Sequence, residues 1–244
     1  MALIQANIES MPAHTRQSFQ LPLATSKQID KISRNFFWQK SGDSAGIPMI
    51  AWDKICRPKK SGGLGLRKME AVNSAFISKL TWKLFHEQSL WVEQMKAKYS
   101  LNERFFDVDC AKYDSWAWKC ILRNRHQFRK GIRWKVGDGT RIHFWLDNWC
   151  ANDNLVSLLA ISDISQLDTS LMVSHFITGT KEWDIMKLKD LVDDVTLQLI
   201  LATPIPSNPI VCWGLSGNGD FSTKTATWAA HGLDIKSSPS WEYS

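Results

Sequence analysis

The sequence lacks both the cysteine spacing of a metal site and the long apolar run of a membrane span. Its cysteines are odd in number and scattered, with no C-x-x-C pair, at Cys56, Cys110, Cys120, Cys150 and Cys212. Such spacing supports neither zinc nor a redox motif, so we expect reduced, mostly buried thiols and no metal ligands. The N-terminus also lacks the basic start and apolar core of a signal peptide. These absences predict a soluble intracellular protein, with nucleus and cytoplasm not distinguished.

Tyrosine is scarce, at three residues, whereas tryptophan is abundant, at thirteen. Large flat side chains each bury much area, so we assign most of the tryptophans to a core. Hydrophobic residues make up 44% of the chain and charged residues 22%, which excludes wholesale disorder.

Positive charge is concentrated in the middle of the chain. Residues 51–150 carry twenty Lys or Arg against ten Asp or Glu, whereas residues 151–244 carry five against eleven. A basic middle followed by an acidic end favours a local surface for a polyanion. Ordinary solvated lysines would give the same count, so the spacing of the cations has to decide between the two interpretations.

Helical spacing dominates the first half. The pattern predicts helices over residues 25–42, 68–87, 90–99, 115–131 and 184–202, the last with or without one break, and a short helix after residue 222. In the first, Ile29, Ile32 and Phe36 fall on one side. The helix over 115–131 separates an apolar arc from a cationic stripe, which consists of Lys119, Arg123, His126 and Lys130.

A β-hairpin is predicted over residues 132–145. Arg133 and Lys135 alternate with apolar residues, a Gly-Asp-Gly turn follows, and the return strand would run from Arg141 to Trp145. Period-two alternation places Arg133, Lys135, Arg141 and His143 opposite the apolar face, although a shift of one residue would turn the return strand over. With a second hairpin near Asn218, the elements predict an α+β fold that is mainly α.

Short motifs then occur in a characteristic order. They are Met11-Pro12-Ala13-His14-Thr15-Arg16-Gln17, Phe36-Phe37-Trp38, Trp52-Asp53-Lys54-Ile55-Cys56-Arg57-Pro58-Lys59, Gly62-Gly63-Leu64-Gly65-Leu66-Arg67, Lys79-Leu80-Thr81-Trp82, Phe144-Trp145-Leu146-Asp147-Asn148-Trp149 and Gly219-Asp220-Phe221-Ser222-Thr223-Lys224. The ordered set spans nearly the whole chain. It resembles plant LINE-type (non-LTR) retrotransposon reverse transcriptases downstream of the polymerase active site.

The resemblance implies three segments. Residues 1–110 would be a thumb-like helical region, residues 111–210 a connection region that contains the hairpin, and residues 211–244 the truncated start of a reverse-transcriptase zinc-binding-like segment. The Cys/His cluster of that segment would lie beyond residue 244, so no residue is assigned to metal. The rest of the polyprotein, an RNA-directed DNA polymerase and RNase H in full-length relatives, is the expected protein partner.

Motifs for chemistry are missing. No Tyr-x-Asp-Asp motif is present, and the adjacent pair Asp193-Asp194 is interpreted as the solvated face of a helix. The run from Gly62 to Leu66 lacks the spacing of a phosphate loop. We therefore expect no catalytic residue, no cofactor and no enzymatic activity of this chain.

A thumb-like bundle follows a nucleic-acid backbone with cations, so we expect weak, sequence-independent contact with RNA or DNA and none with a membrane. The candidate residues are Lys59, Lys60, Arg67, Lys68, Lys119, Arg123, His126, Lys130, Arg133, Lys135 and Arg141. Two alternatives stay open. The chain could be a degenerate retroelement relic without selected function, because Met1 opens in what resembles the middle of a polyprotein. It could also be a piece of an RNA-directed DNA polymerase/RNase H polyprotein that shares the name of the full-length enzymes without their activity.

Overall fold

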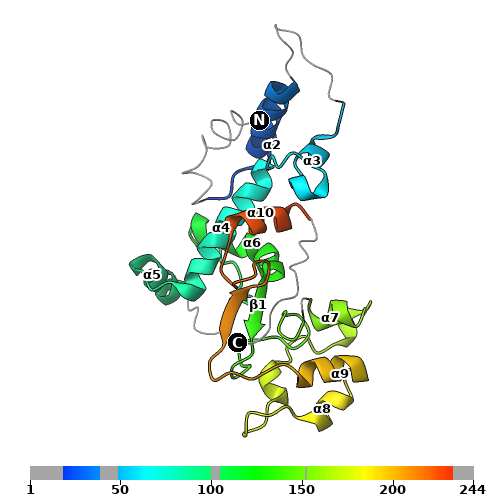
Figure 1. Ribbon diagram of the computed structural model, residues 1–244. Helices are drawn as coiled ribbons and strands as arrows, with labels where there is room; N and C mark the ends of the chain where they lie inside the picture. Colours follow the sequence, from blue (N-terminus) through cyan, green and yellow to red (C-terminus); the bar gives the residue numbers. More distant parts are fainter. Residues whose placement is uncertain (1–18, 39–48, 100–104, 152, 233–244) are drawn as a thin grey trace. The chain divides into compact units, whose positions relative to one another are not determined.

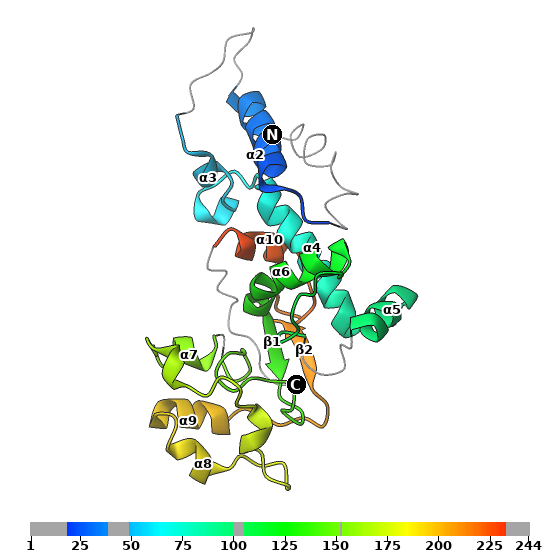
Figure 2. The same cartoon turned by 180° about the vertical axis from the view of Figure 1, so that it is seen from behind.

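The computed structural model describes residues 19–38, 49–99, 105–151 and 153–232, which are mainly helical (Figures 1 and 2). They form two compact units. Unit 1 comprises residues 19–38, 49–93, 108–128 and 221–232, and unit 2 comprises residues 94–99, 105–107, 129–151 and 153–220. The mainly α class predicted from the sequence is confirmed, with a single two-stranded antiparallel sheet in the described part of the chain. The predicted boundaries at residues 110 and 210 stay a prediction.

Unit 1 is built around helix α4 (Met69–His86), against which α2 (Leu23–Trp38) and α10 (Thr223–Ala230) pack (Figure 1). Helix α6 (Trp116–Gly131) is tied to α4 because the Asn124 amide donates to the Ser74 carbonyl (3.2 Å) and to the Ser78 hydroxyl (2.8 Å). Neighbours on several sides explain why α4 buries small polar side chains among its apolar ones. The predicted helix over 68–87 is confirmed.

Helix α2 does not bury the side that its apolar residues suggest. Ile32 and Phe36 are exposed, whereas the buried residues of the helix are Ser26 and Ser33. Small side chains let two helix backbones come close, and α2 is joined to α4 where the Met69 N–H donates to Asp30 Oδ1 at 3.0 Å. The side of α2 that carries Ile32 and Phe36 is therefore not its buried side.

The glycine-rich run after η2 (Lys59–Ser61) packs its backbone against the segment that follows α3 (Trp52–Ile55). The N–H of Gly65 donates to the Arg57 carbonyl at 2.9 Å. A Cβ on Gly63 would lie 2.0 Å from that same carbonyl oxygen, so no larger residue fits there without movement of the backbone. The glycines thus serve close packing of two chain segments.

In unit 2 the predicted return strand was wrong. Strand β1 (Ile132–Lys135) pairs antiparallel with β2 (Ile210–Trp213), with Ile132 opposite Trp213. The turn does form, since the Gly139 N–H donates to the Val136 carbonyl at 3.0 Å. The backbone of residues 142–144 instead forms hydrogen bonds with residues 171–173. The Phe144 N–H, for example, donates to the Leu171 carbonyl at 2.9 Å. A partner distant in sequence has replaced the local one.

Aromatic side chains form the core of unit 2. The ring centroids of Phe144 and Phe176 are 4.2 Å apart, and those of Trp149 and Trp183 are 5.4 Å apart. Both indole N–H groups are hydrogen-bonded. Trp149 Nε1 donates to the Phe144 carbonyl and Trp183 Nε1 donates to the Thr203 carbonyl, each at 2.9 Å. The assignment of most tryptophans to a core is confirmed in this unit.

The other elements largely follow the predicted pattern. The helical segment over 184–202 does break once, into α8 (Ile185–Lys189) and α9 (Asp194–Leu201), and α5 (Leu90–Tyr99) is confirmed. Asp193 is not a residue of a helix face but the N-cap of α9, whose carboxylate accepts the Thr196 N–H at 2.9 Å. Near Asn218 a turn forms, but residues 220–221 make no strand in the described chain. The remaining short elements of unit 2 are α7 (Leu155–Leu158), η3 (Ile164–Gln166) and η4 (Val173–Phe176).

Candidate nucleic-acid interface

The cationic stripe on α6 faces solvent. Lys119, Arg123, His126 and Lys130 are spaced i, i+4, i+7 and i+11, which places them on one side of the helix. The last three are exposed and Lys119 is half-buried, whereas Trp118, Ile121 and Phe128 on the other side are buried. The predicted separation of the stripe from the apolar arc is confirmed. Contact of the stripe with RNA or DNA stays a prediction.

Two members of the stripe have local partners that fix where their charge lies. Lys119 Nζ donates to the Lys112 carbonyl at 2.7 Å, which holds the ammonium near the start of the helix. The Arg123 guanidinium lies over the Trp116 ring, with Cζ 5.2 Å from the ring centroid. Trp116 itself is 52% exposed, so this tryptophan does not belong to the core to which most tryptophans were assigned. Arg123 and Trp116 present a cation and a flat ring together.

The candidate cations between α3 and α4 differ in solvent exposure and in ion pairing. Lys59 is exposed, Arg67 is half-buried, and the side chain of Lys60 lies outside the described parts. Lys68 is half-buried and its Nζ lies 2.5 Å from Asp53 Oδ1, so its charge is already paired. Of the three described side chains in this group, Lys59 is the exposed one.

In unit 2 the predicted basic face of a hairpin is only half present. Arg133 and Lys135 do point away from the buried Ile132 and Trp134 on β1. Arg141 is exposed but lies outside the sheet, because residues 142–144 do not pair with β1. His143 is buried, with Nδ1 3.0 Å from the Thr169 carbonyl and Nε2 3.1 Å from the Asp107 carboxylate. Its placement on the basic face was wrong.

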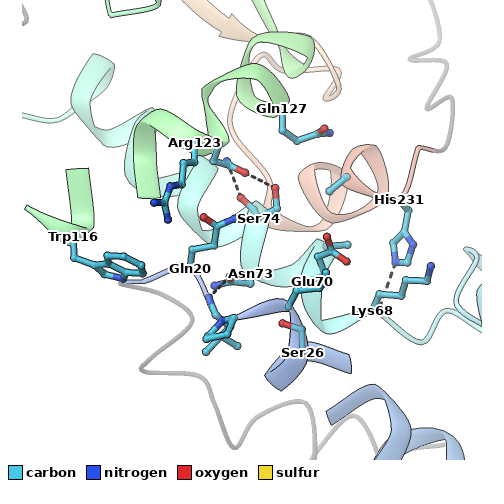
Figure 3. A pocket seen from close by; sticks show the side chains of 16 residues that line it. Gln20, Ser26, Lys68, Glu70, Asn73, Ser74, Trp116, Arg123, Gln127 and His231 are labelled. Atoms are coloured by element: carbon cyan, nitrogen blue, oxygen red, sulfur yellow. Dashed lines mark hydrogen bonds between the residues drawn. The ribbon is translucent and has the colours of Figure 1, made fainter. Parts of the chain in front are cut away.

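A pocket of about 620 Å³ opens in unit 1 beside the α6 stripe (Figure 3). Trp116, Arg123, Asn124 and Gln127 line it from α6 at spacing i, i+7, i+8 and i+11, so Arg123 belongs to both the stripe and the pocket. Residues from α2 and the segment before it, from Lys68 and the first two turns of α4, and from the end of α10 complete the wall. The sequence pattern did not reveal this pocket, although Trp116 stands two turns before Arg123.

Buried amides hold the pocket wall in place. Asn73 Oδ1 accepts the Leu21 N–H, and Asn73 Nδ2 donates to the Phe19 carbonyl, each at 2.8 Å. Asn124 Oδ1 accepts the Ser74 hydroxyl at 2.6 Å. Because buried amides whose hydrogen bonds are satisfied are costly to displace, they fix the segment before α2 and helix α6 against α4.

His231 closes the pocket at the end of α10. Its Nε2 accepts the backbone N–H of Lys68 at 3.3 Å, which places the ring proton on Nδ1. Burial, together with the nearby charge of Lys68, lowers the pKa of His231 to about 4 against a smaller opposing effect of Asp53. The imidazole is therefore neutral at pH 7 and adds no charge to the pocket.

The described residues contain neither a cluster of metal-ligating side chains nor a helix that could span a membrane. Within the described chain, no three His, Cys, Asp or Glu side chains gather where they could hold a metal ion. None of its helices combines the length and apolarity needed to cross a bilayer. The described cysteines are free thiols, buried at Cys56, Cys120 and Cys150, half-buried at Cys212 and exposed at Cys110.

Two proteins of Arabidopsis thaliana are similar to this chain in sequence. One, named "Putative ribonuclease H protein", is 31% identical over 234 residues, which cover 93% of this chain and 38% of that protein. Another, named "Uncharacterized mitochondrial protein", is 25% identical over 146 residues, or 59% of this chain and 95% of that protein. The chain thus spans less than half the length of the first of these relatives. No family model and no solved structure matches. The broad prediction of plant relatives with a ribonuclease H theme is confirmed.

Proposed function

We propose that this chain is a non-catalytic segment of a plant LINE-type retroelement polyprotein that contacts RNA or DNA through phosphate charge. The exposed cationic stripe on α6 is the observation that supports this most. The chain is also similar, over 93% of its length, to a protein named for ribonuclease H, which supports a role in binding nucleic acid. In this proposal residues 1–110 serve as the thumb-like region, and residues 211–244 begin a zinc-binding-like segment that binds no zinc itself.

The expected binding is electrostatic and indifferent to sequence. Cations that neutralise phosphates release condensed counterions, so the logarithm of the affinity falls linearly with the logarithm of the salt concentration. Phosphate contacts carry no information about bases, which predicts similar affinity for unrelated oligonucleotides of equal length. The charge already paired within the protein, as at Lys68, contributes less than the exposed charge on α6.

The test compares two triple variants of equal charge. Replacing Lys119, Arg123 and Lys130 with Ala should weaken binding and flatten the log–log salt slope by about 0.7–0.9 for each phosphate that the variant no longer neutralises. The matched control replaces Lys27, Lys31 and Arg34, which form a similarly spaced cationic stripe on α2. An unchanged slope in the α6 variant would contradict the proposal and favour a relic without selected function. An equal reduction in both variants would mean that binding depends on net charge alone.

We also propose that this chain catalyses neither DNA synthesis nor RNA cleavage. Purified protein should show neither primer extension nor RNA cleavage when Mg²⁺ is added. Activity that requires Mg²⁺ and disappears in a variant with Asp193→Ala and Asp194→Ala would contradict this part of the proposal. Circular dichroism of the variant has to match the parent chain, because Asp193 also caps α9.

A further inference from the structure

We propose that the pocket of unit 1 holds one unpaired nucleotide, with its base stacked beside Trp116 and its phosphate at Arg123. This inference deepens the proposed function and rests on it, because it names the form of nucleic acid that the α6 surface prefers. The whole pocket belongs to unit 1, so the site depends on one compact body. Its volume of about 620 Å³ lies within the roughly 300–1,000 Å³ that is typical of small-molecule sites.

The lining is polar in a way that suits a nucleotide. Small-molecule pockets are usually lined by apolar side chains with a few polar groups. Here the lining includes amide, carboxylate and cationic side chains, with Gln20, Glu70, Arg123 and Gln127 among them. Within the described residues, none of these four side chains has a hydrogen-bond partner inside the protein, in contrast to Asn73 and Asn124. A ligand with both donors and acceptors on one edge, as a nucleobase has, matches such a set.

Stacking is available at one end of the pocket. Figure 3 shows Trp116 and Arg123 on one side of the cavity, with Lys68 and His231 on the opposite side. Bases stack on exposed indoles and on guanidinium planes regardless of their identity, which is how proteins hold single strands. Because Trp116 is half exposed and lies under Arg123, a base can contact the ring while its phosphate meets the guanidinium.

Charge sets the orientation of this nucleotide. Among the described residues Arg123 is the cation of the pocket that has no carboxylate partner, since Lys68 is paired with Asp53. Glu70, an exposed carboxylate among the lining residues, disfavours a phosphate beside it, yet its oxygens accept hydrogen bonds from base amino groups. The neutral imidazole of His231 adds no attraction for phosphate at the far end. The phosphate therefore belongs on the α6 side, in line with the stripe, and the base belongs inside.

Paired bases cannot enter such a pocket, because their edges and faces are occupied in the duplex. The pocket consequently adds affinity for single strands only, whereas the stripe on α6 attracts phosphates of either form. Binding at the stripe and binding in the pocket can therefore be measured separately. Salt dependence reports the stripe, and the ratio of single-strand to duplex affinity reports the pocket.

The experiment measures binding of the full chain to a fluorescent single strand and to a duplex with the same number of phosphates. Trp116→Ala should weaken single-strand binding by about 5- to 100-fold, the reduction expected for one stacked base, and weaken duplex binding far less, because all four cations of the stripe remain. Gln127→Leu, which removes the amide from the pocket without changing the charge beside the stripe, should act in the same direction. Trp116→Phe should restore most of the affinity because a ring remains.

Tyr113→Ala is the matched control. Tyr113 is 88% exposed and has Lys112 Nζ 5.6 Å from its ring centroid, so it repeats the pairing of ring and cation outside the pocket. Its removal should change neither affinity. If Trp116→Ala reduces duplex and single-strand binding equally, or neither, the pocket proposal fails while the stripe proposal stands on its salt slope. If the parent chain binds no oligonucleotide, both fail.

Discussion

Arg129 and Asp147 form an ion pair within unit 2, with Arg129 Nε 2.8 Å from Asp147 Oδ1. Asp147 is 1% exposed, and its other oxygen accepts the backbone N–H of His143 at 2.8 Å. The guanidinium also lies over the Phe106 ring, 4.9 Å from its centroid. One carboxylate thus joins the end of α6 to the loop after β1.

Removing this carboxylate should destabilise the protein strongly. Asp147→Ala leaves a largely buried guanidinium without its partner, which we expect to cost about 3 kcal/mol in the free energy of unfolding. Asp147→Asn keeps an acceptor for the His143 N–H and should cost less. Urea denaturation measures both, with the exposed Asp109→Ala as control. A destabilisation by Asp147→Ala no larger than that of the control would contradict the role of the pair.

A single methyl group should disturb the contact between α6 and β2. A Cβ on Gly131 would lie 2.2 Å from Cη2 of Trp213, so Gly131→Ala forces the indole or the helix end to move. Overpacking of this kind costs about 1–3 kcal/mol in the free energy of unfolding. Gly179→Ala is the matched control, because nothing lies within 4 Å of its added methyl. Thermal unfolding should separate the two variants.

The cap of α9 should make stability depend on pH. A hydrogen bond from the Thr196 side chain, followed by one from its backbone N–H, lowers the pKa of Asp193. A carboxyl with a depressed folded pKa stabilises the protein above its unfolded pKa of about 3.9 and loses that contribution as pH falls through the folded pKa. Asp193→Asn retains a good cap without the charge. Its stability should therefore approach that of the parent chain as pH falls below about 4.

Comparison with Asp193→Ala separates capping from charge. The alanine variant loses the hydrogen bond at every pH and should unfold at lower temperature than the asparagine variant at pH 7. Equal unfolding temperatures for the two variants at pH 7 would indicate that the cap contributes nothing to α9.

Thiol reactivity should follow burial. Cys110 is exposed, whereas burial raises the pKa of Cys150 to about 12, so Cys150 has almost no thiolate at pH 8. Burial also raises the pKa of the half-buried Cys212. We expect one rapidly labelled thiol in the native protein and the others only after denaturation. A rapid phase that survives in Cys110→Ser would contradict this assignment.

Much of the helical structure could be predicted because its signals are local. Apolar residues at helical spacing fix α4, α5 and α6 to within one or two residues. The stripe on α6 follows from the same periodicity, since the arc opposite to it has to be buried. The same spacing does not tell which side of α2 is buried, because that helix buries Ser26 and Ser33 and exposes Ile32 and Phe36.

The sequence by itself determined the mainly α class, the position of the long helices and the exposure of the α6 cations. Only the tertiary structure decided that β1 pairs with β2 rather than with residues 141–145, since two alternative partners for a strand look alike in sequence. Only the tertiary structure, likewise, brought Gln20, Glu70, Trp116 and His231 around one pocket. Periodicity reports which side of an element is buried. It carries no information on which distant element covers that side, and pockets form where distant elements meet.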